Sequence, residues 1–250
     1  MDYILDGFVE ALKLIISFDP EIYRIIILSL LVSTSATMAA SLIFIPLGIF
    51  LGISNFKGKR MFSRLTYTFM GMPSVVVGLL VFIFFSRRGP LGFLDLLFTP
   101  QAMIIAQTLL VLPLIFGLTY SLGKNRARDI KQVAYTLGAN KWSTVILIIR
   151  ELKIDILVNI ATAFSRAISE VGAVMIVGGN IRYHTRVMTT SISMMSSMGD
   201  YPMALALGII LLIISFGIQS FIYSYSQEDE DENFIGKHKK VLWRKKGTRH

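Results

Sequence analysis

An arginine and a glutamate stand four residues apart inside a long, mostly apolar segment of the chain. Arg166 and Glu170 both fall between residues 154 and 178. Residues four apart share one face of a helix, so the two side chains can form an ion pair. If the segment spans a membrane, Arg166 lies about 12 residues, or roughly 18 Å, from its nearer end. An unpaired arginine there costs about 2.5–3.5 kcal/mol on insertion scales, and pairing with Glu170 reduces that cost.

This spacing leaves two roles open for the pair. It could flank or gate the passage of an anion, or it could clamp helices together in a dimer. A run of small and polar residues follows, in which the arginines could attract an anion or meet acidic residues of a partner. Solvation of a loop would explain these residues equally well. The run contains Gly178, Gly179, Asn180, Arg182, His184, Thr185 and Arg186.

No other set of residues predicts an active site. Gly117 to Lys124 resembles a phosphate-binding loop, but its spacer is one residue too long and Asn125 replaces Ser or Thr. The three histidines lack metal-ligand spacing, and the absence of cysteine excludes thiolate ligands and thiol nucleophiles. We therefore predict a transport protein without catalytic residues, bound cofactor or metal.

Composition indicates the class of protein that carries these residues. The chain of 250 residues is 54% hydrophobic, and its mean hydropathy is +0.63. Apolar segments long enough to cross a bilayer recur along it, which predicts an all-α polytopic membrane protein with about five transmembrane helices. The predicted spans cover residues 25–53, 65–85, 101–122, 154–178 and 202–225.

The segments outside the spans divide the chain into three parts. Residues 1–24 hold a predicted amphipathic helix at about 5–17, with Leu5, Phe8 and Leu12 among the residues of its apolar side. Residues 25–225 form the transmembrane domain. Residues 226–250 form a charged tail, in which an acidic run precedes a basic stretch.

The distribution of positive charge predicts the orientation. Most of the 25 Lys and Arg residues lie in the loop between spans one and two, in the loop at 123–153, or in the tail. These regions should be cytoplasmic, with the N-terminus outside and the C-terminus inside. Anchoring of this kind accounts for the net charge of +9, so we expect contact with membrane lipid and no nucleic-acid partner.

The cytoplasmic loop at 123–153 contains a helix–turn–helix pattern. Residues 129–137 can form one helix with Ile130, Val133, Ala134 and Leu137 on a common face. Gly138 suits a left-handed C-cap, and Asn140 can cap a second helix that starts at Lys141. Two helices at such a turn could insert into a groove on another protein, although an ordinary hairpin at the membrane surface would look similar.

These residues resemble the EAA loop of permeases of ATP-binding-cassette importers, whose pattern is E-A-A-x3-G-x9-I-x-L-P. Ala134, Gly138 and Ile148 match, whereas Gln132 and Val133 replace the first two residues of the pattern. Arg150-Glu151 stands where Leu-Pro is usual. The resemblance places Gly138 and Ala139 at the turn that docks on an ATPase, with Ala134 and Ile148 on the buried faces.

The next segment is similar to the oxyanion permeases, in particular those for tungstate and, less closely, molybdate. The similarity lies in residues 165–173 and 177–181, followed by Thr185–Thr190, and it extends over roughly residues 20 to 225. Beside this resemblance, we expect Arg166, Glu170, Gly178, Gly179 and Asn180 to lie at the translocation path or its gate, with a structural clamp between helices as the alternative for the ion pair.

The resemblance implies a type I importer permease with the MetI-like fold, located in the cell membrane. Two copies of the chain would form the path, two cytoplasmic ATPases would hydrolyse ATP, and an extracytoplasmic protein would deliver the oxyanion. Molybdate or sulfate remains an alternative cargo. A stand-alone transporter is less consistent with five spans and a large loop. A membrane-embedded enzyme would need a polar cluster beyond Glu170.

Overall fold

The computed structural model describes residues 2–17 and 19–246, and it describes the backbone alone at residues 2–4, 11, 14, 15, 221 and 225–246. The charged tail predicted at 226–250 therefore lies outside the described side chains. The described residues form helices and no strand, which confirms the all-α prediction. The elements are α1 (Asp2–Ile16), α2 (Pro20–Ile53), α3 (Lys59–Met70), α4 (Ser74–Phe85), η1 (Gly92–Leu94), α5 (Pro100–Asn125), α6 (Arg128–Thr136), α7 (Lys141–Glu151), α8 (Lys153–Ile168), α9 (Gly172–Gly178), α10 (Met188–Met198) and α11 (Tyr201–Lys246).

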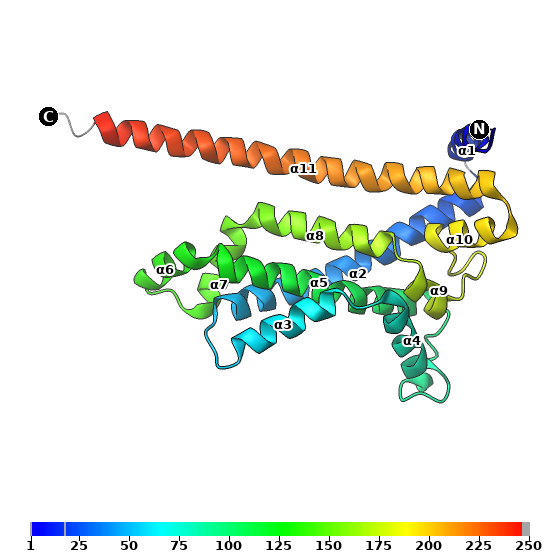
Figure 1. The fold of residues 1–250 in the computed structure, drawn as a ribbon, viewed down its shortest axis with the longest axis horizontal. Helices are drawn as coiled ribbons and strands as arrows, with labels where there is room; N and C mark the ends of the chain where they lie inside the picture. The colour runs from blue at the N-terminus through cyan, green and yellow to red at the C-terminus, as the bar shows by residue number, and fades with distance from the viewer. Residues whose placement is uncertain (1, 18, 247–250) are drawn as a thin grey trace.

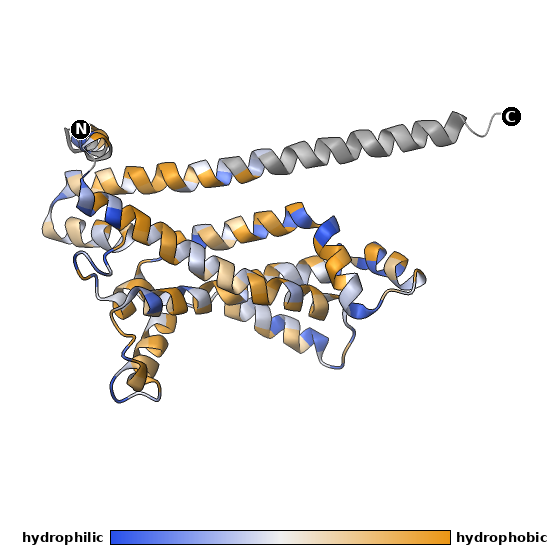
Figure 2. Cartoon of the chain, turned by 180° about the vertical axis from the view of Figure 1, so that it is seen from behind, coloured by the Kyte–Doolittle hydropathy of each residue, from blue (hydrophilic) through white to orange (hydrophobic). Residues whose placement is uncertain are grey.

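Three continuous helices are long and apolar enough to cross a membrane: α2, α5 and the part Tyr201–Ser224 of α11. Two further candidates are bent pairs, in which α3 meets α4 at 90° and α8 meets α9 at 56°. Counting each pair as one span gives up to five, in agreement with the predicted number. The bends lie inside the second and fourth predicted spans, and hydropathy did not predict them. Figure 2 shows the apolar residues along these helices.

The sequence Gly71-Met72-Pro73 explains the first of these bends. Proline has no backbone N–H, and its ring disfavours the helical conformation in the residue before it. Gly71 accordingly ends α3, and Pro73 adopts an extended conformation (φ −62°, ψ 130°) immediately before α4. The chain thus turns sharply within an apolar region that hydropathy alone treats as one helix.

The centre of the bundle is the contact between α2 and α5. Gly48 and Gly52 of α2 both face α5. A Cβ atom on Gly52 would lie 2.6 Å from the carbonyl oxygen of Tyr120 and 2.9 Å from the Cα of Gly123. The two backbones therefore touch directly, as small residues allow in membrane helices.

The two ends of the bundle carry different elements (Figure 1). The helices α6 and α7 lie at one end, called here the α6–α7 end. The helix α10, the start of α11 and α1 lie at the other, called the α10 end. The predicted amphipathic helix is present as α1, and Gly7 packs it against Leu205 of α11. The described residues of its apolar side, Leu5, Phe8, Val9, Leu12 and Ile16, are exposed.

Replacement of Gly52 by valine should destabilise the bundle. The new side chain would overlap the backbone of α5, and overpacking of this kind typically costs about 1–3 kcal/mol. We expect a lower unfolding temperature and less folded protein after purification in detergent. Gly217→Val is the matched control, because a Cβ at Gly217 of α11 has no atom within 4 Å. Equal stability of the two variants would contradict the close approach of α2 and α5.

Candidate functional site

The break between α8 and α9 is held by the buried side chain of Glu170. Only 2% of this side chain is exposed. Its Oε2 accepts a hydrogen bond from Nη1 of Arg166 at 3.0 Å, and its Oε1 accepts one from the backbone N–H of Ala173 at 3.0 Å. The hydroxyl of Thr189 in α10 donates to the backbone carbonyl of Glu170 at 2.7 Å. Glu170 therefore joins α8, α9 and α10 at one point.

The two members of the ion pair have unequal environments. The carboxylate of Glu170, two residues before α9, accepts from an N–H of its first turn, where the free N–H groups favour negative charge. Arg166 is 43% exposed, although it lies inside a candidate span. The structure thus places the carboxylate inside the bundle and leaves the guanidinium partly exposed, with one hydrogen bond to Glu170.

The two bends lie side by side in space. A Cβ on Gly172, the first residue of α9, would lie 2.8 Å from Cγ2 of Val75 near the start of α4. A Cβ on Gly78 of α4 would lie 2.6 Å from the Cα of Ala173. Sequence reasoning missed this contact. Its signals were the glycines and Pro73, which permit close backbone approach and a break, respectively.

Local hydrogen bonds hold the segment between α9 and α10, residues 179–187, in its conformation. The hydroxyl of Thr185 donates to the carbonyl of Gly178 at 2.5 Å and accepts from the N–H of Ile181 at 3.0 Å. Thr185 is fully buried, so its side chain is not displayed at the surface where an outer-face candidate was expected. Gly179 and Asn180 both have positive φ, and Nδ2 of Asn180 lies 3.3 Å from Sδ of Met194.

The arginines of this segment, in contrast, converge on one carboxylate. Arg182 contacts Glu21 of α2 through two hydrogen bonds, Nε to Oε1 at 2.9 Å and Nη2 to Oε2 at 2.5 Å. Arg186 approaches the same carboxylate at 3.6 Å. The hydrogen bond with Glu21 raises the pKa of Arg182 above its ordinary value. Arg182 and Arg186 are thus both paired with the carboxylate of Glu21, a residue that sequence reasoning did not single out.

The loop at the α6–α7 end folds as its capping residues predict. α6 and α7 match the predicted helices, and Gly138 has the left-handed φ of +79°. The N–H of Ala139 donates to the carbonyl of Ala134 at 3.0 Å, and Oδ1 of Asn140 accepts from the N–H of Ser143 at 2.8 Å. Local hydrogen bonds therefore fix the turn between the two helices.

Side chains of this turn divide into a buried and an exposed set. Ala134 and Ile148 are buried, as the family resemblance implied, while Gln132 is exposed. The four residues predicted to share a face of α6 do not share one environment, because Ala134 is buried, Ile130 is half-buried and two are exposed. Large apolar side chains consequently project from the two helices: Val133, Leu137 (80% exposed), Trp142 (58% exposed) and Ile146.

Two contacts tie this turn to the spans. Nζ of Lys131 donates to the carbonyl of Ile53 at the end of α2, at 2.5 Å. Arg126 and Asp155 form an ion pair between the end of α5 and the start of α8. The helix α6 is therefore bonded to the end of α2, and the two spans that flank the loop are bonded to each other. In the part of the chain that the structure describes, no three potential metal ligands gather into a group.

These features define a polytopic membrane transport subunit, with an exposed helical turn at one end and bent helices around a charged pair. The chain belongs to the family of inner membrane components of binding-protein-dependent transport systems, whose model matches residues 44–227.

Three curated relatives are similar over most of the chain. The tungstate uptake system permease protein TupB of Peptoclostridium acidaminophilum is 62% identical over 91% of this chain and all of its own length. A probable anion ABC transporter permease of Haloferax volcanii is 39% identical over 77% of this chain and 85% of its own. The TupB protein of Campylobacter jejuni is 38% identical over 86% of this chain and 90% of its own.

Removal of Arg166 should destabilise the protein more than removal of Glu170. Arg166→Gln leaves a buried carboxylate with one bond fewer, which costs about 1–3 kcal/mol or more. Glu170→Gln leaves no buried charge without a partner, because Arg166 is 43% exposed, and the new amide oxygen can still accept from Ala173 or from Arg166. We expect the unfolding temperature to fall further in Arg166→Gln.

The double variant Arg166→Gln/Glu170→Gln tests the same argument. Because it removes the stranded charge, it should unfold at a higher temperature than Arg166→Gln alone. Glu151→Gln, at an exposed position of α7, serves as the control for loss of one acidic group. A larger fall in unfolding temperature in Glu170→Gln than in Arg166→Gln would contradict this prediction. It would show that Arg166 depends on the ion pair more than Glu170 does.

Proposed function

We propose that this chain is the permease subunit of a tungstate importer that belongs to the ATP-binding-cassette class. The observation that carries the proposal is the 62% identity with a tungstate uptake permease over that relative's full length. The second tungstate relative, from a different organism, and the anion permease support the same cargo class. ATP hydrolysis and recognition of the anion in solution belong to separate subunits in this proposal.

The α6–α7 end faces the cytoplasm in this proposal, and the α10 end faces outward. The α6–α7 end holds the turn after α2 and the loop from α5 to α8, where lysine and arginine residues gather. Positive charge in short loops favours the cytoplasmic side. The N-terminus is then outside and the C-terminus inside.

The exposed apolar side chains around Gly138 form the surface on which the ATPase docks. Leu137 and Trp142 are exposed on either side of a hydrogen-bonded turn between the two helices, and Gly138 itself has open space around it. An apolar projection of this shape suits a groove between lobes of a partner. Movement of the groove would pull α6, and Lys131 would transmit the pull to α2.

The anion passes beside Arg166, along a face completed by a second copy of the chain. The exposed side of α4 is strongly apolar, with Val76, Leu80 and Phe84 among its residues, and requires lipid or protein to cover it. A fully free arginine would hold a dianion too tightly to release it. Arg166, neutralised in part by Glu170, attracts the anion and still allows release.

The extracytoplasmic binding protein docks at the α10 end in this scheme. Arg182 and Tyr183 are exposed there, and Glu21 holds Arg182 and Arg186 in place. Gly179 and Asn180 direct the chain from the end of α9 into this surface. An acidic group of the binding protein could share these arginines with Glu21.

Gly138→Asp should abolish docking of the ATPase while the permease still inserts and folds. The substitution strains a residue at φ +79° and adds a charge at the apolar turn. Co-purification of the ATPase with tagged permease measures the effect. Gly199→Asp is the control, because Gly199 has φ +80° and equally open space at the opposite end. Normal ATPase recovery with Gly138→Asp would reject the docking surface.

Deletion of this chain should abolish uptake of tungstate at nanomolar concentration. Cellular tungsten measured by mass spectrometry, with molybdate or sulfate in excess as competitor, distinguishes the cargoes. Uptake that depends on the chain and resists both competitors is the expected result. Strong competition by molybdate would indicate a broader oxyanion importer, and unchanged tungsten content would contradict the proposed cargo.

A further inference from the structure

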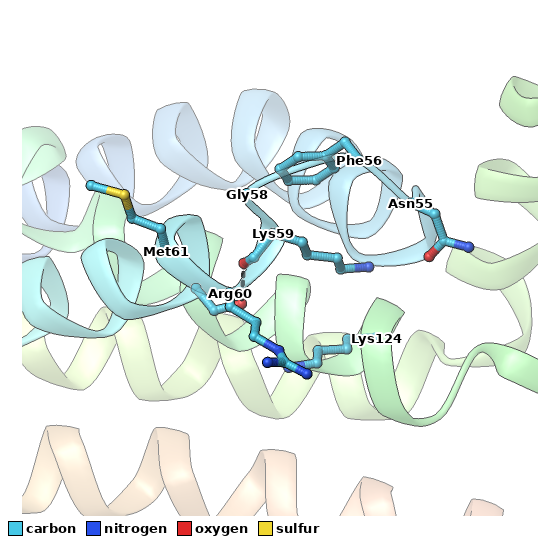
Figure 3. Close-up of a pocket in the computed structure, with 8 residues that line it drawn as sticks. Asn55, Phe56, Gly58, Lys59, Arg60, Met61 and Lys124 are labelled. Carbon is cyan, nitrogen blue, oxygen red and sulfur yellow. Dashed lines mark hydrogen bonds between the residues drawn. The ribbon is translucent and has the colours of Figure 1, made fainter.

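A basic cavity lies at the turn between α2 and α3, next to the end of α5. Its volume is about 680 Å³. A second cavity of about 350 Å³ shares Asn55, Lys59 and Lys124 with it and extends to α6. Figure 3 shows the side chains that surround the first cavity. No residue that lines the first cavity takes part in the proposed passage of the anion or in the contact with the ATPase.

All charged residues that line the two cavities are cationic: Lys59, Arg60, Lys124, Arg128 and Lys131. Two of these are already committed to the end of α2. Nζ of Lys59 donates to the carbonyls of Gly52 at 2.5 Å and Ser54 at 2.7 Å, and Lys131 donates to Ile53. These bonds satisfy carbonyl groups that a helix C-terminus leaves without partners.

Arg60, Lys124 and Arg128 differ from the two committed lysines. Within the described part of the chain, these three side chains make no hydrogen bond or ion pair to the protein. All three are exposed, and Figure 3 shows the charged ends of Arg60 and Lys124 beside the same cavity. Several like charges around one concavity raise the local positive potential, which an anion would relieve.

Apolar side chains adjoin these cations. Phe56 and Met61 line the cavity and are exposed, and exposed Leu65 follows one turn further along α3. The cavity therefore combines cations with an apolar edge at the end of three membrane helices. A free inorganic anion would contact the cations alone. A phospholipid would contact both parts of the cavity, because its phosphate can bind the cations and its acyl chains can lie against the apolar side chains.

We propose that this cavity binds the phosphate group of an anionic phospholipid. Arg60 and Lys124 contact the phosphate, and Met61 and Leu65 lie against the acyl chains. Basic pockets between membrane helices commonly hold acidic head groups in this way. Because Arg128 and Lys131 of α6 line the adjoining cavity, the bound lipid would also brace the ATPase-docking turn against α2 and α3.

The test uses the full-length chain purified in detergent and supplemented with lipid. We compare unfolding temperature and lipid retained in native mass spectrometry with phosphatidylglycerol or with phosphatidylcholine. Phosphatidylglycerol should raise the unfolding temperature and remain bound, and phosphatidylcholine should do so far less. Arg60→Gln/Lys124→Gln should lose at least half of the phosphatidylglycerol effect. Arg87→Gln/Arg88→Gln removes two exposed cations at a different loop and should keep it.

Two further arms make the outcome decisive. Millimolar inorganic phosphate at constant ionic strength separates a lipid from a free anion, and an equal thermal shift with phosphate would overturn the lipid assignment. Lys124→Arg should retain the effect of phosphatidylglycerol, since the charge is preserved. If both double variants respond to phosphatidylglycerol as the wild type does, the cavity is not the site of lipid binding.

Discussion

A helix that breaks inside a membrane exposes backbone groups that have no water to bond with, and the fold of this permease depends on how those groups are satisfied. At the end of α8 the solution is the carboxylate of Glu170, which accepts from the N–H of Ala173 and so covers part of the start of α9. The same carboxylate also accepts a hydrogen bond from Arg166, which lowers the free-energy cost of burying its negative charge. One side chain thus makes the bend possible and brings an arginine to a membrane-embedded surface.

The bend between α8 and α9 contacts two other parts of the structure, α4 and α10. The start of α9 packs on α4, at the point where the second bent pair turns at Pro73. Small residues on both sides, Gly78 and Ala173, let the two short helices approach closely. Because the start of α10 is also bonded to Glu170 through Thr189, the segment that carries Arg182 and Arg186 takes its position from the same junction. A change in the geometry of the bend would therefore alter the position of this segment at the α10 end.

The parts of the structure that sequence reasoning predicted are those governed by local rules. Gly138 and Asn140 specify the turn between α6 and α7 through backbone conformation and a cap, which involve neighbouring residues only. Hydropathy gave the number of spans for a similar reason, because it measures composition within a window. Composition carries no information on continuity, so the bend at Glu170 was missed. The burial of Thr185 and the pairing of Glu21 with Arg182 join distant segments, and no local pattern encodes them.

Charge compensation distinguishes the arginines of the proposed path from the basic cluster at the turn between α2 and α3, and this difference bears on how an anion could cross the molecule. Arg166, Arg182 and Arg186 each have a carboxylate partner. An anion on the proposed path would therefore be attracted less strongly by each of these residues than by an unpaired arginine. Arg60, Lys124 and Arg128 have no acidic residue lining their cavities. A dianion that met such a cluster in its path would be retained, because Coulomb attraction grows steeply where water is partly excluded. The uncompensated cluster therefore fits a permanent anionic neighbour in the membrane better than a stage in transport, and the paired arginines fit a cargo that must leave.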